Sequence, residues 1–353
     1  MATNSKILDA IVRHRIAVER AANLEAARTL RVVGENDAEI IAMLRARLPH
    51  LTPGSQTARR TVQLVNAIKN SRKALWVKTH QATRSALVAF ARIEGDTIQR
   101  IADRFITKKT TGVRAIKLRQ LVTSEPFSPA ANQARNLSQW FGKLAADDQD
   151  RLTGALRLGI RNQDTVETMV RRIAGTKANN FKDGVMTISR RGAEVAVRTA
   201  VNHSANMAHA EWASQNRDIV VGLQRVAILD RRTCAQCAGL DGGIVKTGNA
   251  PLPPGSREIT EVGPVHGSCR CTMVPVLAGE AQAPQETYPE WLKRQPREVQ
   301  EDVLGKTKAK LFKDGDLKIE EFTSPRGKTL TLDELSKARP EAFEKSGLNP
   351  DDF

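Results

Sequence analysis

The chain has 353 residues, 40% hydrophobic and 27% charged, which is the composition of a folded protein long enough for two domains. Aromatic residues make up only 4%, so the cores must be built mainly from Ala, Leu, Val and Ile, which favours helices. Neither an N-terminal signal-like stretch nor a run of about 18 apolar residues is present, so we expect a soluble protein made in a cytosol with reduced thiols.

The net charge of +16 is concentrated at the start of the chain. Residues 1–120 carry 23 lysines and arginines against 9 aspartates and glutamates, and no acidic residue lies between Glu39 and Glu94. The ordinary interpretation is a solvated helical surface, but such surfaces normally mix both signs, so we expect contact with a polyanion such as DNA. The candidate DNA contacts are Arg59, Arg60, Lys69, Arg72, Lys73, Lys78, Arg84, Lys108 and Lys109.

Helical periodicity dominates the first 216 residues. The apolar spacing predicts a helix over 5–32 ended by Gly34, and a second capped by Asn36 or Asp37 that continues to Leu48. The following helices are predicted over 55–93, from 95 to 105, and over 128–144, 147–158, 163–173 and 189–214.

The pattern changes after residue 216. Short β-prone runs at 219–221 and 226–229, a hairpin return at 244–245 and a closing strand over 271–277 predict a small sheet, with Pro275 favouring an edge. The tail returns to helices, one ended by Gly305 and one opened by a capping box at 331–334.

These patterns predict an α+β protein in four parts. A basic helical region at 1–120 and a helical region at 121–216 precede a zinc-binding core with short strands at 217–279, and a helical tail occupies 280–353.

All four cysteines lie in one stretch, as a Cys234-x-x-Cys237 knuckle and a His266-x-x-Cys269-x-Cys271 cluster. Two short clusters separated by a loop are what one tetrahedral zinc ion needs, whereas four unrelated buried thiols would not fall into such spacings. The best ligand set is Cys234, Cys237 and Cys269 with either His266 or Cys271. A filled tetrahedral site is structural and contributes folding energy.

A zinc-dependent nucleobase deaminase is the alternative, because His209-Ala-Glu211 followed by Cys234-x-x-Cys237 matches most of its pattern. Against it, the proline of that pattern is missing, a turn is predicted after the second cysteine, and the donors at 266–271 would have no purpose. A DNA regulator with a zinc module lacks a recognition helix beside the cluster. No other catalytic motif is present, and we expect no enzyme.

The cysteine stretch also resembles a known family. Leu229-Asp-Arg-Arg-Thr-Cys-Ala-Gln-Cys-Ala-Gly-Leu-Asp-Gly242, a Pro-rich loop and His266-Gly-Ser-Cys-Arg-Cys-Thr-Met-Val-Pro275 resemble the Mu F-like minor head proteins of tailed bacteriophages, the head morphogenesis family. Supporting matches are Arg198-Thr-Ala-Val-Asn202 upstream and 291–305 downstream, so the resemblance covers roughly 160–340.

This resemblance implies a non-enzymatic protein of the virion, assembled in the host cytoplasm and located inside the capsid head at the portal vertex. The implied partners are the portal protein and the major capsid or scaffolding protein, with no membrane in the assembled head, and the protein can leave with the genome at infection. The charge distribution adds contact with double-stranded DNA, without sequence preference and with steep salt dependence.

Overall fold

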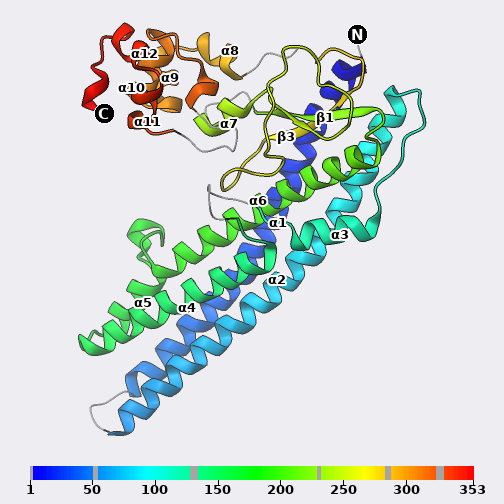
Figure 1. Ribbon diagram of the computed structural model, residues 1–353. Helices are drawn as coiled ribbons and strands as arrows, with labels where there is room; N and C mark the ends of the chain where they lie inside the picture. The colour runs from blue at the N-terminus through cyan, green and yellow to red at the C-terminus, as the bar shows by residue number, and fades with distance from the viewer. Residues whose placement is uncertain (1–2, 51–54, 128–133, 229–231, 283–287, 323–329) are drawn as a thin grey trace.

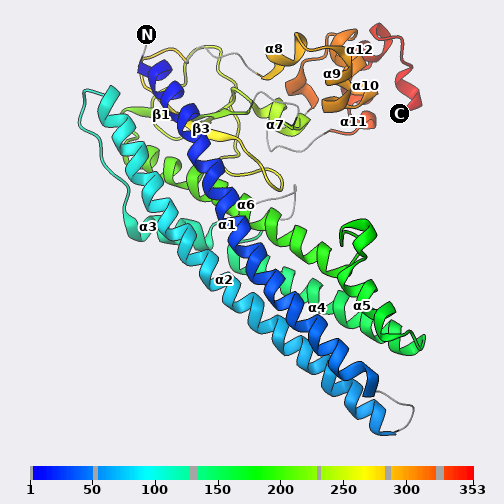
Figure 2. The same ribbon diagram turned by 180° about the vertical axis from the view of Figure 1, so that it is seen from behind.

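The computed structural model describes residues 3–50, 55–127, 134–228, 232–282, 288–322 and 330–353. Long helices form an elongated bundle, a three-stranded sheet lies at one end of it, and short C-terminal helices gather beside the sheet (Figure 1). The view from behind places the N-terminus at the sheet end of the bundle (Figure 2). The expected α+β class, helical first and with a small sheet later, is confirmed.

The first helix, α1 (Thr3–Arg47), is continuous where the sequence predicted two helices, and a 3₁₀ turn (Leu48–His50) follows it. Gly34 does not end α1, although glycine inside a helix costs roughly 1 kcal/mol relative to alanine. Burial of Ile40 and Leu44 beyond it offsets this cost. Asn36 and Asp37, predicted to cap a second helix, instead lie buried within α1.

The second helix, α2 (Ser55–Phe105), is also continuous where the sequence predicted a new helix at Gly95. A Cβ added at Gly95 would lie 2.3 Å from Val113 Cγ2, in the segment that leads into α3 (Ala115–Ser124). Glycine is therefore needed there for close packing, and it does not mark a helix end.

Three further helices complete the bundle: α4 (Leu137–Arg161), α5 (Val166–Ala174) and α6 (Val185–Gln215). The helices predicted at 128–144 and 147–158 are one helix, which Asn136 caps by accepting a hydrogen bond from the Gln139 N–H. The predicted start at 128–133 lies outside the described residues. A 3₁₀ turn (Lys177–Asn179) lies between α5 and α6.

Arg72 joins four helices at the centre of the bundle. Its guanidinium donates to Asp37 Oδ1 at 2.6 Å and to both carboxylate oxygens of Asp148 at 2.6 and 3.0 Å. Asp37 also accepts from Arg190 Nε at 2.6 Å, and Asp148 accepts from Trp76 Nε1 at 2.8 Å. Since an unpaired buried charge costs several kcal/mol, this network favours one register of α1, α2, α4 and α6.

The sheet is antiparallel with strand order β2-β1-β3, formed by β1 (Val220–Val226), β2 (Ile244–Lys246) and β3 (Thr272–Leu277). β1 contains two residues of the run predicted at 219–221 and only the first residue of the run predicted at 226–229, with an irregularity between Val220 and Gly222. Ala227 and Ile228 follow the strand, and residue 229 lies outside the described residues. Pro275 lies on the edge strand β3, as predicted. No strand of the sheet pairs with the outer side of β3, so the missing N–H of Pro275 costs no hydrogen bond between strands there.

The first turn of α1 is tied to the end of β3. Asn4 Oδ1 accepts from the Leu277 N–H at 2.9 Å, and Asn4 Nδ2 donates to the Ala281 carbonyl at 2.9 Å. The Asn4 N–H donates to the Glu280 carboxylate at 2.9 Å, and Ile7 packs into the core beneath the sheet. Residues at the start of α1 and residues at and just after the end of β3 are therefore in direct contact.

The tail is helical, as predicted. It contains α8 (Tyr288–Lys293), α9 (Arg297–Leu304), α10 (Lys306–Lys313), α11 (Leu332–Ala338), α12 (Pro340–Lys345) and 3₁₀ turns at Ile319–Phe322 and Pro350–Asp352. Gly305 ends α9, and the capping box between Thr331 and Glu334 is formed. The tail helices share one core with Ala238 in the segment after Cys237, whereas α1, α2, α4 and α6 share another. The four-part division of the chain stays a prediction. No helix in the described ranges is both long and apolar enough to cross a membrane.

Candidate metal centre

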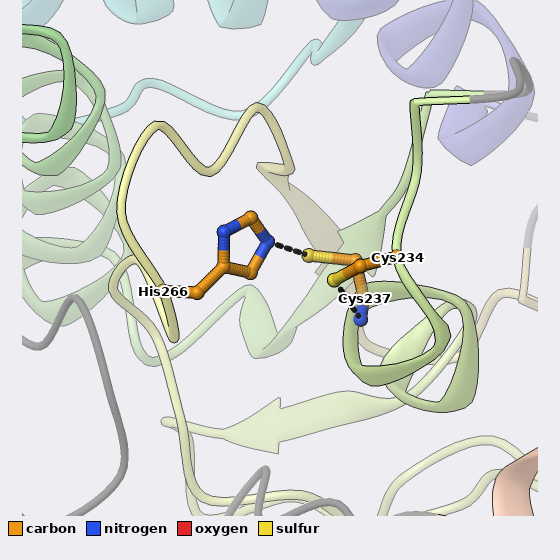
Figure 3. A group of neighbouring side chains, drawn as sticks. All are labelled: Cys234, Cys237 and His266. Atoms are coloured by element: carbon orange, nitrogen blue, oxygen red, sulfur yellow. Dashed lines mark hydrogen bonds between the residues drawn. The ribbon is translucent and has the colours of Figure 1, made fainter. Parts of the chain in front are cut away.

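The two predicted ligand clusters meet in space. Cys237 Sγ lies 3.0 Å from His266 Nε2 and 3.6 Å from Cys269 Sγ, and Figure 3 shows the His266 ring facing the knuckle. The donor atoms form two overlapping groups, each with all atoms within 4.8 Å: Cys234, Cys237 and His266, and Cys237, Cys269 and Cys271. All five predicted donors thus lie in one cluster, and Cys237 is common to both groups.

The knuckle is built at the start of a short helix, α7 (Ala235–Leu240). Cys234 is its N-cap residue, and its Sγ accepts from the Cys237 N–H at 3.5 Å. The sequence predicted a turn directly after Cys237, but the Cys234 cap and the following Ala and Leu residues extend the helix to Leu240, and the turn comes at Asp241 and Gly242.

Asp241 ends α7 and joins it to its surroundings. Its carboxyl group accepts from the Ala227 N–H at 2.8 Å and from the Tyr288 N–H at 2.5 Å. Burial raises the pKa of Asp241 to about 6. The Tyr288 hydroxyl donates to the Thr233 carbonyl at 3.1 Å, so the end of β1, the knuckle and α8 are held together.

The second cluster lies on a tight turn before β3. The Cys269 N–H donates to the His266 carbonyl at 3.3 Å, and Ser268 between them has the left-handed φ of 57°. The Ser268 N–H donates to Thr199 Oγ1 of α6 at 2.8 Å. This turn brings the His266 and Cys269 side chains to the same side, toward Cys237.

One face of α6 binds the backbone of the strand that carries Cys271. Asn202 Nδ2 and Asn206 Nδ2 donate to the Cys271 carbonyl at 3.1 and 3.3 Å, and His209 Nδ1 lies 2.7 Å from the Met273 carbonyl. With the contact to Ser268, these residues form what we name the α6 ladder: Thr199, Asn202, Asn206 and His209.

The sequence indicated Thr199 and Asn202 through the family resemblance and His209 through the deaminase pattern, but it did not indicate Asn206. The available signal was a set of polar residues three or four apart in an Ala-rich helix, which places them on one face. All four are buried, and a buried polar side chain needs a hydrogen-bond partner.

Arg225 of β1 is a buried cation beside the cluster. Its Nη2 lies 3.5 Å from Cys269 Sγ, and its Nη1 donates to the Gly263 carbonyl at 3.0 Å. Burial alone would lower the pKa of Arg225, but the negative charge of Cys271, Cys269 and Cys237 raises it above its ordinary value. The guanidinium therefore stays charged and offsets the excess negative charge of thiolates around a divalent ion.

The donors differ in how readily they lose the protons that metal binding displaces. Hydrogen bonding with Cys237 lowers the pKa of Cys234 to about 4 and also holds the pKa of Cys269 well below its ordinary value. Burial would lower the pKa of His266, but hydrogen bonds to Cys234 and Cys269 raise it to about 10. Cys234 and Cys269 are thus available as thiolates, the form that binds metals. Hydrogen bonding with Cys234 raises the pKa of Cys237, and the pKa of Cys271 is raised as well, so an ion bound by Cys237, Cys271 or His266 must displace a proton.

The geometry of the cluster fits a tetrahedral ion. Two thiolates that each lie about 2.3 Å from zinc are about 3.8 Å apart, close to the 3.6 Å between Cys237 and Cys269. Five donors can fill four positions and leave none for water, which suits a structural site. The cluster can therefore hold a metal ion, and His266 and Cys271 remain alternative fourth ligands.

The deaminase alternative required His209 and Glu211 at the metal. His209 instead contacts the Met273 carbonyl, and its Nε2 lies 4.0 Å from Glu94 Oε2. Glu211 accepts from Gln215 Nε2 at 2.8 Å. In the part of the chain that the structure describes, neither residue joins a donor group with the cysteines. The deaminase site is therefore not assembled.

The predicted DNA contacts differ in exposure. Arg72 has no exposed side-chain surface and is bound by Asp37 and Asp148, so it does not reach DNA and is removed from the set. Lys108 is exposed but pairs with Asp218 at 2.6 Å. Lys69 is half-buried, and the exposed remainder consists of Arg59, Arg60, Lys73, Lys78, Arg84 and Lys109.

Residues 148–274 match the family described as Phage Mu protein F like protein. The matched region runs from α4 through α6 and the metal cluster into β3, and it leaves out the tail that the sequence resemblance had included. Neither the curated proteins nor the solved structures gave a match. The family match confirms the resemblance seen in the cysteine stretch and suggests a structural protein of a bacteriophage head.

Proposed function

We propose that the chain is a minor head protein of a tailed bacteriophage, which acts in head morphogenesis at the portal vertex inside the capsid. The observation that carries the proposal is the family match over residues 148–274, since this segment contains the α6 ladder and all five donors of the cluster. Its partners in this proposal are the portal protein and the major capsid or scaffolding protein.

In this proposal one zinc ion, bound by Cys234, Cys237, Cys269 and either His266 or Cys271, stabilises the sheet region. The donor types and their spacing support zinc, and the surplus of donors supports a role without turnover. When bound, the ion would join the knuckle to the turn before β3, so that folding and metal binding are coupled.

The exposed basic residues of α2 support contact with packaged DNA. Phosphate contacts position a protein without reading sequence, so binding should show no sequence preference and should weaken steeply with salt. A protein bound in this way inside the head can also leave with the genome.

Mass spectrometry of purified virions and of emptied heads tests the proposal. We expect the chain in virions at low copy, together with the portal protein, and absence from virions despite abundance in the lysate would contradict it.

A salt titration tests the DNA part and needs the full chain, because α1 and α2 pack against α6. An affinity that does not change with salt would remove the DNA contact.

A further inference from the structure

Three arginines line a hollow between α2 and α3. Arg84 and Arg92 come from α2 and Arg119 from α3, and the hollow has a volume of about 280 Å³. Its remaining wall consists of Ser85, Val88 and Ala89. The wall thus contains three cations, no acidic residue and no aromatic ring.

Helical geometry brings these arginines together. Arg84 and Arg92 are eight residues apart, with Val88 midway, so they lie on one face of α2. Leu118 and Val122 anchor α3 by their buried side chains, and Arg119 stands on its exposed side. All three arginines are exposed, and none forms an ion pair with an acidic residue in the described part of the chain.

Three cations around one hollow repel one another unless an anion lies between them. A guanidinium presents a planar fork of N–H donors that fits two oxygens of a phosphate group. Without an aromatic wall the hollow offers no platform for base stacking, which favours contact with the phosphate backbone.

We propose that Arg84, Arg92 and Arg119 form a seat for phosphate groups of double-stranded DNA. The inference rests on the DNA contact in the proposed function and locates it, adding Arg92 and Arg119 to the predicted residues. DNA is favoured over an acidic protein segment because exposed Lys73 and Lys78 continue the basic surface along α2. A polymer with evenly repeated charge can neutralise the whole run.

The test compares two triple variants of the full chain by fluorescence anisotropy with a duplex of mixed sequence. In the seat variant R84Q/R92Q/R119Q, the dissociation constant should rise at least tenfold. Its slope of log K against log salt should be smaller by about 2 to 3, since each phosphate contact contributes about 0.9. The control R31Q/R157Q/K182Q removes the same charge from exposed positions outside both the hollow and the predicted DNA contacts, and it should weaken binding less than threefold. Unchanged melting temperatures would show that both variants fold.

Each other result overturns the seat in a distinguishable way. Equal loss in both variants would leave the DNA contact standing and place it elsewhere. No DNA binding by the unaltered chain would remove the proposed DNA contact as well. Binding of an acidic peptide, lost only in the seat variant while DNA binding is kept, would assign the hollow to a protein partner. R84K/R92K/R119K keeps the charge without the forks and should lie between the seat variant and the unaltered chain.

Discussion

Cys237 is the donor on which the metal centre depends most, because it alone belongs to both donor groups. Cys237→Ser should therefore abolish stoichiometric zinc binding. The zinc contents of His266→Ala and Cys271→Ser should differ from each other, because a tetrahedral site needs only one of these two side chains as its fourth ligand. Zinc content by mass spectrometry of the purified protein checks this. A Cys237→Ser protein that keeps its zinc would contradict a single shared ion.

His203 of α6 should make the fold sensitive to acid. It is buried against Phe127, and burial lowers its pKa to about 4, so the native state holds it neutral while the unfolded chain binds a proton near pH 6.5. Stability from this group is complete above pH 6.5 and is lost as the pH falls toward 4, by up to about 3 kcal/mol.

Urea unfolding at a series of pH values tests the role of His203. The slope of the unfolding free energy against pH between about 4.5 and 6.5 reports the number of protons taken up on unfolding, and in His203→Leu this number should be smaller by up to about one. Metal release also weakens the protein in acid, so both proteins are measured with chelator present. An unchanged slope would show that other groups carry the acid sensitivity.

Single residues also show what the sequence could indicate. The five donors were predictable, because their spacing along the chain is itself the signal. The burial of Arg72 was not, because its partners Asp37 and Asp148 lie 35 and 76 residues away and nothing local marks them. A basic residue in a basic helix looks exposed until the helices that cover it are placed.

Among the elements, α6 is the support for the metal strand. In the double variant Asn202→Ala/Asn206→Ala the Cys271 carbonyl loses both donors, and Arg15 Nη1 loses the Asn202 oxygen that it contacts at 2.7 Å. Each unsatisfied buried group should cost about 1 to 3 kcal/mol. Zinc affinity should fall about 10- to 100-fold, as is typical when groups that orient ligands are removed.

Chemical unfolding and competition with a zinc chelator measure the two effects separately. Ile188→Ala, an exposed position on the same helix, serves as the control and should change stability by no more than about 0.5 kcal/mol. A double variant that loses stability but keeps full zinc affinity would show that the α6 ladder has no influence on the metal centre.

The helices and strands were largely predictable, and the errors share a cause. Local propensity predicts that Gly34 ends one helix and that Gly95 begins another, yet α1 and α2 continue through these glycines because of tertiary packing. The edge position of Pro275 and the capping box at Thr331 were correct, because both depend on local backbone chemistry. Local signals identified turns and caps, whereas helix length was decided by tertiary contacts.

At the scale of the whole molecule, metal removal should change the stability of the sheet region much more than that of the helical bundle around Arg72. Chelation should raise amide hydrogen exchange in β1, β3 and α7, since zinc would tie the knuckle to the turn before β3. Exchange in α2 and α4 around Arg72 should change little, because that network contains no donor of the cluster. Mass-resolved exchange with and without chelator checks this, and uniform loss of protection would contradict separate stabilisation.

The contact between Asn4 and Leu277 spans 273 residues and affects how the protein is made. The first helix emerges from the ribosome early, but the strand that covers its apolar start follows only after roughly 15 to 50 s at ordinary elongation rates. During that interval Ile7 and its neighbours can pack only against residues of α2 and α6, such as Ile98 and Trp212, and not against β3. The yield of folded protein in a cell should therefore depend on translation speed and on chaperones that hold nascent chains.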